Sequence, residues 1–212
     1  MKQKKKSYIK FVYFAVVLIT AILLTKPGQT FIASSSLIYQ LLSDPFGIKP
    51  NATITSSHIK EVSFTSRDQQ IYGDLWIPEK KYPKTAIILE IGTNISRGDQ
   101  RLLRLGKVIS EKGFVIFIPD IPSLQQRRLS PDSKEDLVNT FIYLRKNLPK
   151  DIKIGFLGIC ATGGLMPLAA QDERINSDVD FVISINPYFD LKELFIEVTT
   201  GQFTKDGNIT QW

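Results

Sequence analysis

The stretch KIGFLGICATGGLMPLAA, Lys153–Ala170, decides the fold because a strand pattern changes into a helix pattern inside it. Its first half is a continuous apolar run, which is typical of a strand buried on both faces. The residues after Cys160 are small and lead into a helical pattern. Cys160, the one cysteine of the chain, is therefore expected at the carboxyl end of a buried strand, where open α/β sheets bind their ligands.

The residues around Cys160 match a nucleophile flanked by small residues. Gly158 and Thr162 lie two positions before and after it, and Gly163 follows. Such a tight turn from strand to helix requires small residues there and holds the nucleophile strained and exposed. The free N–H groups at the start of the helix place partial positive charge beside the sulfur. A second reading stays open, in which Cys160 is a small buried hydrophobic residue and the glycines only allow close packing.

Strand and helix patterns alternate along the rest of the chain. Two β-rich runs at residues 58–66 and 69–79 are separated by a two-residue turn, which is a hairpin pattern. Buried-strand runs follow in TAIILEIGT, FVIFIPDIP, DIKIGFLGIC and VDFVISINPYF, with amphipathic helix patterns between them. The helix at PDSKEDLVNTFIYLRKNL opens with Asp132 and Glu135 in capping-box spacing. This order predicts an α/β fold with a mostly parallel, doubly wound sheet covered by helices on both faces.

The sequence resembles the α/β-hydrolase family over residues 58–195. The motif GICATGG, with cysteine at the position of the serine nucleophile, is most similar to the dienelactone-hydrolase-like branch. The segment LWIPEKKYPKTAIILEIGTN resembles the second and third strands of the family and the loop that follows them. The segments EKGFVIFIPDIP and AAQDERINSDVDFVISINPYFD resemble the regions of its fourth and sixth strands.

This resemblance implies a reaction and a site. Cys160 would attack the carbonyl group of a small-molecule ester, lactone or thioester, and no cofactor would be needed. The oxyanion would be held by the backbone N–H of Ala161 and by that of Thr93 or Asn94, although a plain turn at the strand exit remains the alternative for this loop. The elbow residues that the resemblance implies are Gly158, Thr162 and Gly163.

The chain departs from the family pattern in its catalytic triad. The family order is nucleophile, acid and histidine, but the one histidine of the chain, His58, comes well before Cys160. His58 is expected on the first strand at the far edge of the sheet, and Asp190 occupies a less common position for the acid. No seventh or eighth strand pattern follows. We therefore expect either a chain that lacks the C-terminal part of the domain or a fold that has lost catalysis, inactive in both cases as it stands.

Two alternatives to a hydrolase follow from the same patterns. One is a non-catalytic α/β-hydrolase-like binding module, and the other is an unrelated doubly wound ligand-binding domain. Dinucleotide and P-loop chemistry are disfavoured because neither glycine-rich motif occurs. No metal site is expected, because one histidine and one cysteine cannot form a usual zinc cluster. No nucleic-acid partner is expected, since no basic stripe with interleaved aromatic residues is present.

The N-terminus has the pattern of a membrane segment. Six lysines in the first 26 residues account for the net charge of +6, and five of them precede an apolar run from Phe11 to Leu24. Residues 8–26 are long enough to cross a bilayer if Lys10 extends to the headgroups. The lysines favour a cytoplasmic N-terminus, which predicts an uncleaved anchor with the folded domain on the extracytoplasmic face. Signal cleavage near residues 33–36, with secretion, is the alternative.

The sequence thus predicts three parts. Residues 1–28 form the signal anchor, which ends at Pro27 and Gly28. Residues 29–55 form a juxtamembrane helix and a linker. Residues 56–212 form the N-terminal portion of an α/β-hydrolase-like domain.

Overall fold

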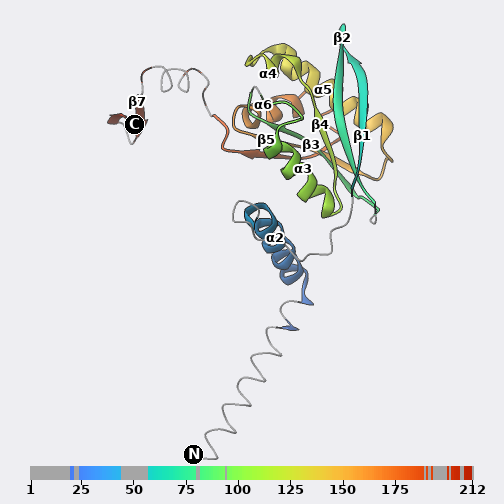
Figure 1. Ribbon diagram of the computed structural model, residues 1–212. Helices are drawn as coiled ribbons and strands as arrows, with labels where there is room; N and C mark the ends of the chain where they lie inside the picture. The colour runs from blue at the N-terminus through green and yellow to red at the C-terminus, as the bar shows by residue number, and fades with distance from the viewer. Residues whose placement is uncertain are drawn as a thin grey trace, which may run out of the picture. The chain divides into compact units, whose positions relative to one another are not determined.

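The computed structural model describes most of the chain (Figure 1). The described residues are 20–21, 24–43, 57–79, 82–93, 95–188, 190, 192, 200, 202–205 and 208–211. The chain divides into two compact units, Met1–Thr53 and Ile54–Trp212. The predicted boundaries of the signal anchor at residue 28 and of the juxtamembrane segment at residue 55 stay predictions.

The described part of the N-terminal unit is dominated by helix α2, Lys26–Ser43. Pro27 lies in its first turn, where a missing N–H costs nothing, and the hydroxyl of Thr25 accepts a hydrogen bond from the N–H of Gly28 (3.3 Å). A helix therefore begins where the sequence predicted the anchor to end. Among the helices of the described residues, none has the length and apolar character that a bilayer span requires. The predicted span at residues 8–26 lies outside the described residues, apart from residues 20, 21 and 24–26.

The second unit contains a six-stranded sheet in the order β1-β2-β4-β3-β5-β6. Strands β4, β3, β5 and β6 are parallel, whereas β2 is antiparallel to both β1 and β4. The predicted opening hairpin and parallel sheet are therefore confirmed. The strands are β1 Ser57–Ser66, β2 Gln69–Pro78, β3 Thr85–Ile91, β4 Val115–Pro119, β5 Lys153–Ile159 and β6 Val179–Ile185.

Helices cover both faces of this sheet, as the alternating patterns predicted (Figure 1). Helix α3, Gln100–Glu111, packs on one face, where Gly106 lies against Ile116, Ile118 and Trp76. Helices α5, Pro131–Asn147, and α6, Ala161–Ala170, pack on the other face. The short helix α4, Pro122–Gln125, follows β4. Alternate side chains of the central strands therefore enter different halves of the core.

The capping of α5 differs from the prediction. Ser130 is the N-cap residue, and its backbone N–H donates to the hydroxyl of Ser133 (3.2 Å). Pro131 occupies the first turn, which places the cap before Asp132 rather than at it. Asp132 pairs instead with Arg67 (3.1 Å), and Glu135 pairs with Arg174 in the loop between α6 and β6 (2.6 Å).

The described strands after β6 also differ from the expectation. Sequence patterns indicated no further strands, but β7, Gln202–Lys205, and β8, Asn208–Gln211, form a two-stranded antiparallel sheet of their own. β6 is an edge strand of the larger sheet among the described residues. Three of its apolar side chains are exposed by 36 to 46%, and these are Val182, Ile183 and Ile185.

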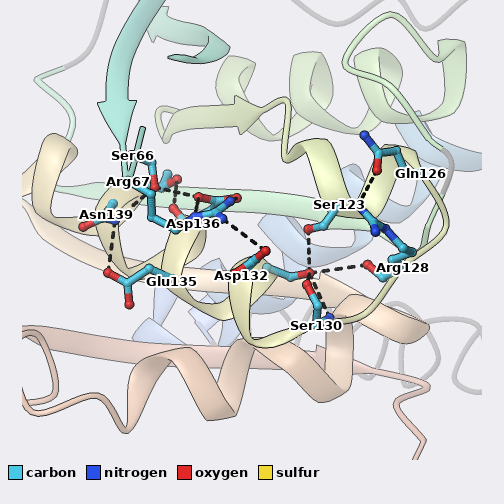
Figure 2. Close-up of polar contacts among 12 residues, drawn as sticks. Ser66, Arg67, Ser123, Gln126, Arg128, Ser130, Asp132, Glu135, Asp136 and Asn139 are labelled. Carbon is cyan, nitrogen blue, oxygen red and sulfur yellow. Dashed lines mark hydrogen bonds and ion pairs between the residues drawn. The ribbon is translucent and has the colours of Figure 1, made fainter. Parts of the chain in front are cut away.

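An ion pair joins the tip of the β1–β2 hairpin to α5 (Figure 2). Arg67, in the turn, has a φ of 54° and directs its guanidinium at the fully buried carboxylate of Asp136 (2.8 and 3.1 Å). The hydroxyl of Ser66 also donates to this carboxylate (2.6 Å), and Asn139 donates to that hydroxyl (3.0 Å). A buried carboxylate is tolerated only with such partners, so this contact holds the tip of the hairpin against α5.

Replacement of Arg67 by alanine should therefore leave Asp136 buried without its cation. We expect Arg67→Ala to lower the free energy of unfolding by about 2 kcal/mol, less than a fully buried pair loses because Arg67 is partly exposed. Urea unfolding of the full chain measures this change. Arg128→Ala is the control, because Arg128 is exposed and contacts Gln126 at the surface. Equal losses from the two variants would contradict the assignment.

Candidate active site

Cys160 lies between the last residue of β5 and the first residue of α6, as the sequence predicted. Its backbone has φ 62° and ψ −126°, a conformation that non-glycine residues rarely adopt and that costs roughly 1–3 kcal/mol. Its N–H donates to the carbonyl oxygen of Ile185 at the end of β6 (2.9 Å), and its side chain is exposed. The exposed position of this thiol at the carboxyl edge of the sheet is therefore accompanied by backbone strain that lowers the stability of the fold.

The close approach of α6 to β5 explains the small residues around Cys160. A Cβ atom at Gly158 would lie 2.6 Å from the carbonyl oxygen of Thr162 and 2.7 Å from the side chain of Met166. The N–H of Gly163 donates to the carbonyl oxygen of Cys160 and closes the turn (2.9 Å). The three predicted elbow residues therefore lie at one strand-to-helix turn.

Thr162 contributes more than the small size that the sequence indicated. Its hydroxyl is buried and lies within hydrogen-bond distance of the carbonyl oxygens of Glu90 (2.9 Å) and Ile159 (3.0 Å). The same oxygen accepts from the N–H groups of Gly92 and Ile159 (both 3.2 Å). This one side chain ties the elbow to the end of β3.

The loop after β3 brings Thr93 next to the elbow. Gly92 has a φ of 58°, which favours glycine, and its N–H donates to the carbonyl oxygen of Ile159 (2.8 Å). Thr93 follows directly, and Ala161 begins α6. Within the described part of the chain, the N–H groups of Thr93 and Ala161 donate to no other residue. Asn94, the alternative to Thr93, lies outside the described residues.

A buried carboxyl group borders the elbow on β3. Glu90 pairs in register with Gly158 and is only 3% exposed. Burial raises the pKa of the Glu90 carboxyl well above its usual range, and the nearby carboxylate of Asp120 raises it further. A hydrogen bond from the backbone of Ile91 acts in the opposite direction. The environment therefore favours the neutral form of Glu90.

A cluster of charges holds the far end of the same loop. The guanidinium of Arg97 contacts Asp120 (2.7 Å), Asp74 (2.6 Å) and Glu61 (2.6 Å). Gln125 donates to the second oxygen of Asp120 (2.5 Å). These carboxylates thus have an arginine as their cation, and within the described ranges no three His, Cys, Asp or Glu residues are grouped so as to hold a metal ion.

The histidine of the chain lies far from the thiol. His58 is in β1, an edge strand, as predicted. Strand register places it level with Ile154 at the start of β5, whereas Cys160 follows the end of that strand. Four strand spacings of about 4.8 Å separate β1 from β5, so the two side chains lie at least about 19 Å apart. Asp190 is exposed, and its carboxylate accepts from the N–H of Lys192 (2.8 Å).

Sequence patterns missed three residues of this region, which are Glu90, Arg97 and Asp120. Glu90 left a signal, because it is an acid inside an otherwise apolar strand pattern. The pairing of Arg97 with Asp120 left none, since the contact joins positions that are distant in the sequence. Only the order of β3 and β4 in the sheet brings them together.

No protein-family model and no curated protein sequence matches the chain. Solved structures do match it. A dienelactone hydrolase from Anabaena variabilis is 21% identical over 59% of this chain and 62% of its own, with a TM-score of 0.51. Brefeldin A esterase, a bacterial homologue of human hormone-sensitive lipase, is 12% identical over 77% of this chain and 53% of its own, with a TM-score of 0.56. An arylesterase is 17% identical over 84% and 59%, with a TM-score of 0.55.

These similarities define the class of the fold. The second unit has the mixed sheet and the elbow of the α/β-hydrolase fold, and its structural neighbours are a dienelactone hydrolase and esterases. The predicted resemblance to this fold is confirmed. The chain spans between 53% and 62% of the length of these three proteins.

The raised pKa of Glu90 predicts a pH dependence of stability. The folded chain retains a proton on Glu90 that the unfolded chain releases. The contribution of Glu90 to the free energy of unfolding is therefore complete below the pKa of the unfolded state, and it is lost as the pH rises toward the pKa of the folded state. Wild type should therefore lose more stability than Glu90→Gln between about pH 5 and about pH 8. Urea unfolding at both pH values measures the difference. The exposed Glu173→Gln is the control, and equal pH dependence of wild type and Glu90→Gln would refute this explanation.

Proposed function

We propose that the protein is a hydrolase-like enzyme that reacts with small-molecule esters, lactones or thioesters through Cys160. The observation that carries this proposal is the strained backbone of Cys160 at the turn from β5 to α6. A protein retains such strain where a side chain must be held in one exposed position. The names of the structural neighbours, a dienelactone hydrolase and esterases, support the same class of substrate.

The proposed reaction begins with attack of the Cys160 sulfur on the substrate carbonyl carbon. A carbon–sulfur bond forms, the bond to the leaving oxygen or sulfur breaks, and the thiol proton passes to solvent. The negative charge that develops on the carbonyl oxygen is stabilised by the N–H of Ala161 and the N–H of Thr93, with Asn94 as the alternative to Thr93. The position of Gly92 against the elbow supports the assignment of this loop.

Hydrolysis of the resulting thioester requires a base that activates water. His58 lies across the sheet from Cys160 and cannot reach it, and it is the one histidine of the chain. We therefore propose that the chain as it stands is acylated once and turns over slowly or not at all. A non-catalytic binding module would not be acylated, so acylation of Cys160 distinguishes a hydrolase-like enzyme from such a module.

Reaction of the full chain with 4-nitrophenyl acetate tests this proposal. We expect a burst of about one equivalent of nitrophenolate per chain followed by little further release, because acylation needs no second turnover. Iodoacetamide should alkylate the same thiol and abolish the burst. Absorbance measures the release, and peptide mass spectrometry locates the acyl group.

Cys160→Ser is the matched variant for this experiment, since serine keeps the size of the side chain but has no base to activate it. It should show no burst and no alkylation. A wild type that reacts with iodoacetamide but not with the ester would exclude the hydrolase proposal and favour a binding module. Sustained turnover that is lost in Cys160→Ser would instead show that another residue supplies the base.

We also propose that residues 8–26 anchor the protein in a membrane with the folded domain on the extracytoplasmic face. The lysines before the apolar run support this orientation. Helix α2, which follows in sequence, exposes Phe31, Ile32, Ile38 and Tyr39 by 50 to 68%. Exposed apolar side chains of this kind suit a position near lipid.

Deletion of residues 1–27 should move the chain from the membrane fraction to the soluble fraction, because the apolar run is then absent. Sedimentation and immunoblotting measure the distribution, and a chain without residues 202–212 is the control that should stay with the membrane.

In intact cells, a membrane-impermeant thiol reagent should label Cys160, whose side chain is exposed. Membrane retention of the deletion variant would argue against the anchor, and protection of Cys160 would argue against the orientation.

A further inference from the structure

The loop between β3 and α3 is fixed at two points, and Thr93 lies between them. At its first end, Gly92 is held by the carbonyl oxygen of Ile159 and by the hydroxyl of Thr162. At its second end, the backbone N–H of Arg97 donates to the carboxylate of Asp120 (3.3 Å). A shift of the loop at Gly92 or at Arg97 would therefore break these hydrogen bonds.

The side chain of Arg97 strengthens the second point. Its Nε donates to Asp120 just after β4 (2.7 Å), and one terminal nitrogen contacts both Asp74 of β2 and Glu61 of β1 (2.6 Å each). Arg97 and Asp120 are each 24% exposed, and Asp74 is 17% exposed. A planar guanidinium can bind carboxylates in several directions at once, which a lysine ammonium on a flexible stem does less well.

We propose that Arg97 is a positioning residue for the oxyanion site, because it sets the place of the Thr93 N–H relative to Cys160. This inference rests on the proposed acylation of Cys160. Donors to an oxyanion act over a narrow range of about 2.7–3.1 Å, so a small movement of the loop weakens the interaction. A misplacement of about 1 Å can lower a rate by about 10²-fold.

Two electrophiles separate this role from a purely structural one. The reaction with 4-nitrophenyl acetate develops negative charge on a carbonyl oxygen and needs the oxyanion site. Iodoacetamide reacts by displacement of iodide at a CH₂ carbon, which places no charge on an oxygen held by the loop. A change in the exposure of the thiol alters both rates and leaves their ratio unchanged. A change in the ratio of the acylation rate to the alkylation rate therefore measures a change in the stabilisation of the oxyanion.

The experiment compares full-length wild type with Arg97→Ala and Arg97→Lys under conditions in which circular dichroism shows each chain to be folded. We expect Arg97→Ala to lower the ratio by about 10-fold to 10²-fold. Arg97→Lys keeps one ion pair and should lower the ratio less. If Arg97→Ala does not fold, Arg97→Lys decides, and an unchanged ratio overturns the proposal.

Arg67→Ala is the matched control. Arg67 also ties the β1–β2 hairpin to the rest of the domain through a carboxylate, and its side chain is 26% exposed against 24% for Arg97. Among the described residues, the guanidinium of Arg67 pairs with Asp132 and Asp136 of α5 and not with the loop between β3 and α3, so the ratio should stay at its wild-type value. Equal loss of both rates in Arg97→Ala would assign Arg97 to stability alone and overturn the proposal. A wild type that is alkylated but never acylated would instead exclude the hydrolase function on which it rests.

Discussion

The buried hydroxyl of Thr162 is the contact on which the rest of the site depends. It lies where β3, β5 and α6 meet, and it forms hydrogen bonds with backbone groups of Glu90, Gly92 and Ile159. A polar backbone group in this position is costly when unpaired. Because the same hydroxyl contacts both the elbow and the loop after β3, it links the turn at Cys160 to the loop that carries Thr93.

Two arginines complete the framework, one at the tip of the β1–β2 hairpin and one near the middle of its strands. Arg67 joins the hairpin tip to α5 through the buried Asp136, and Arg97 joins both strands of the hairpin to the end of β4. Each arginine makes charge-assisted hydrogen bonds, which are directional and therefore fix geometry. The antiparallel hairpin is thus held in register with the parallel sheet that carries the thiol.

The parts of this structure that sequence predicts are those encoded by neighbouring residues. The apolar runs of β3, β4 and β5 and the small residues around Cys160 lie within short windows, so both the parallel sheet and the place of the elbow could be predicted. The N-cap of α5 was predicted wrongly. Asp132 and Ser130 are both suitable N-cap residues followed three positions later by a polar side chain, and the choice between them depends on the backbone turn before Pro131.

Contacts between distant positions could not be predicted in this way. The pairing of Arg97 with Asp120 depends on the order of β3 and β4 in the sheet, and the neutral state favoured for Glu90 depends on how completely the fold buries it. No local pattern encodes strand order or burial of this kind. The distance of His58 from Cys160, in contrast, followed from its expected place on the first strand.

A crystal structure of the full chain after acylation tests the central claim most directly, because it locates the acyl group and its carbonyl oxygen together. We predict a thioester on the sulfur of Cys160, with the carbonyl oxygen about 2.7–3.1 Å from the N–H nitrogens of Ala161 and Thr93. An acyl group on another residue, or a carbonyl oxygen directed to solvent away from both N–H groups, would contradict it.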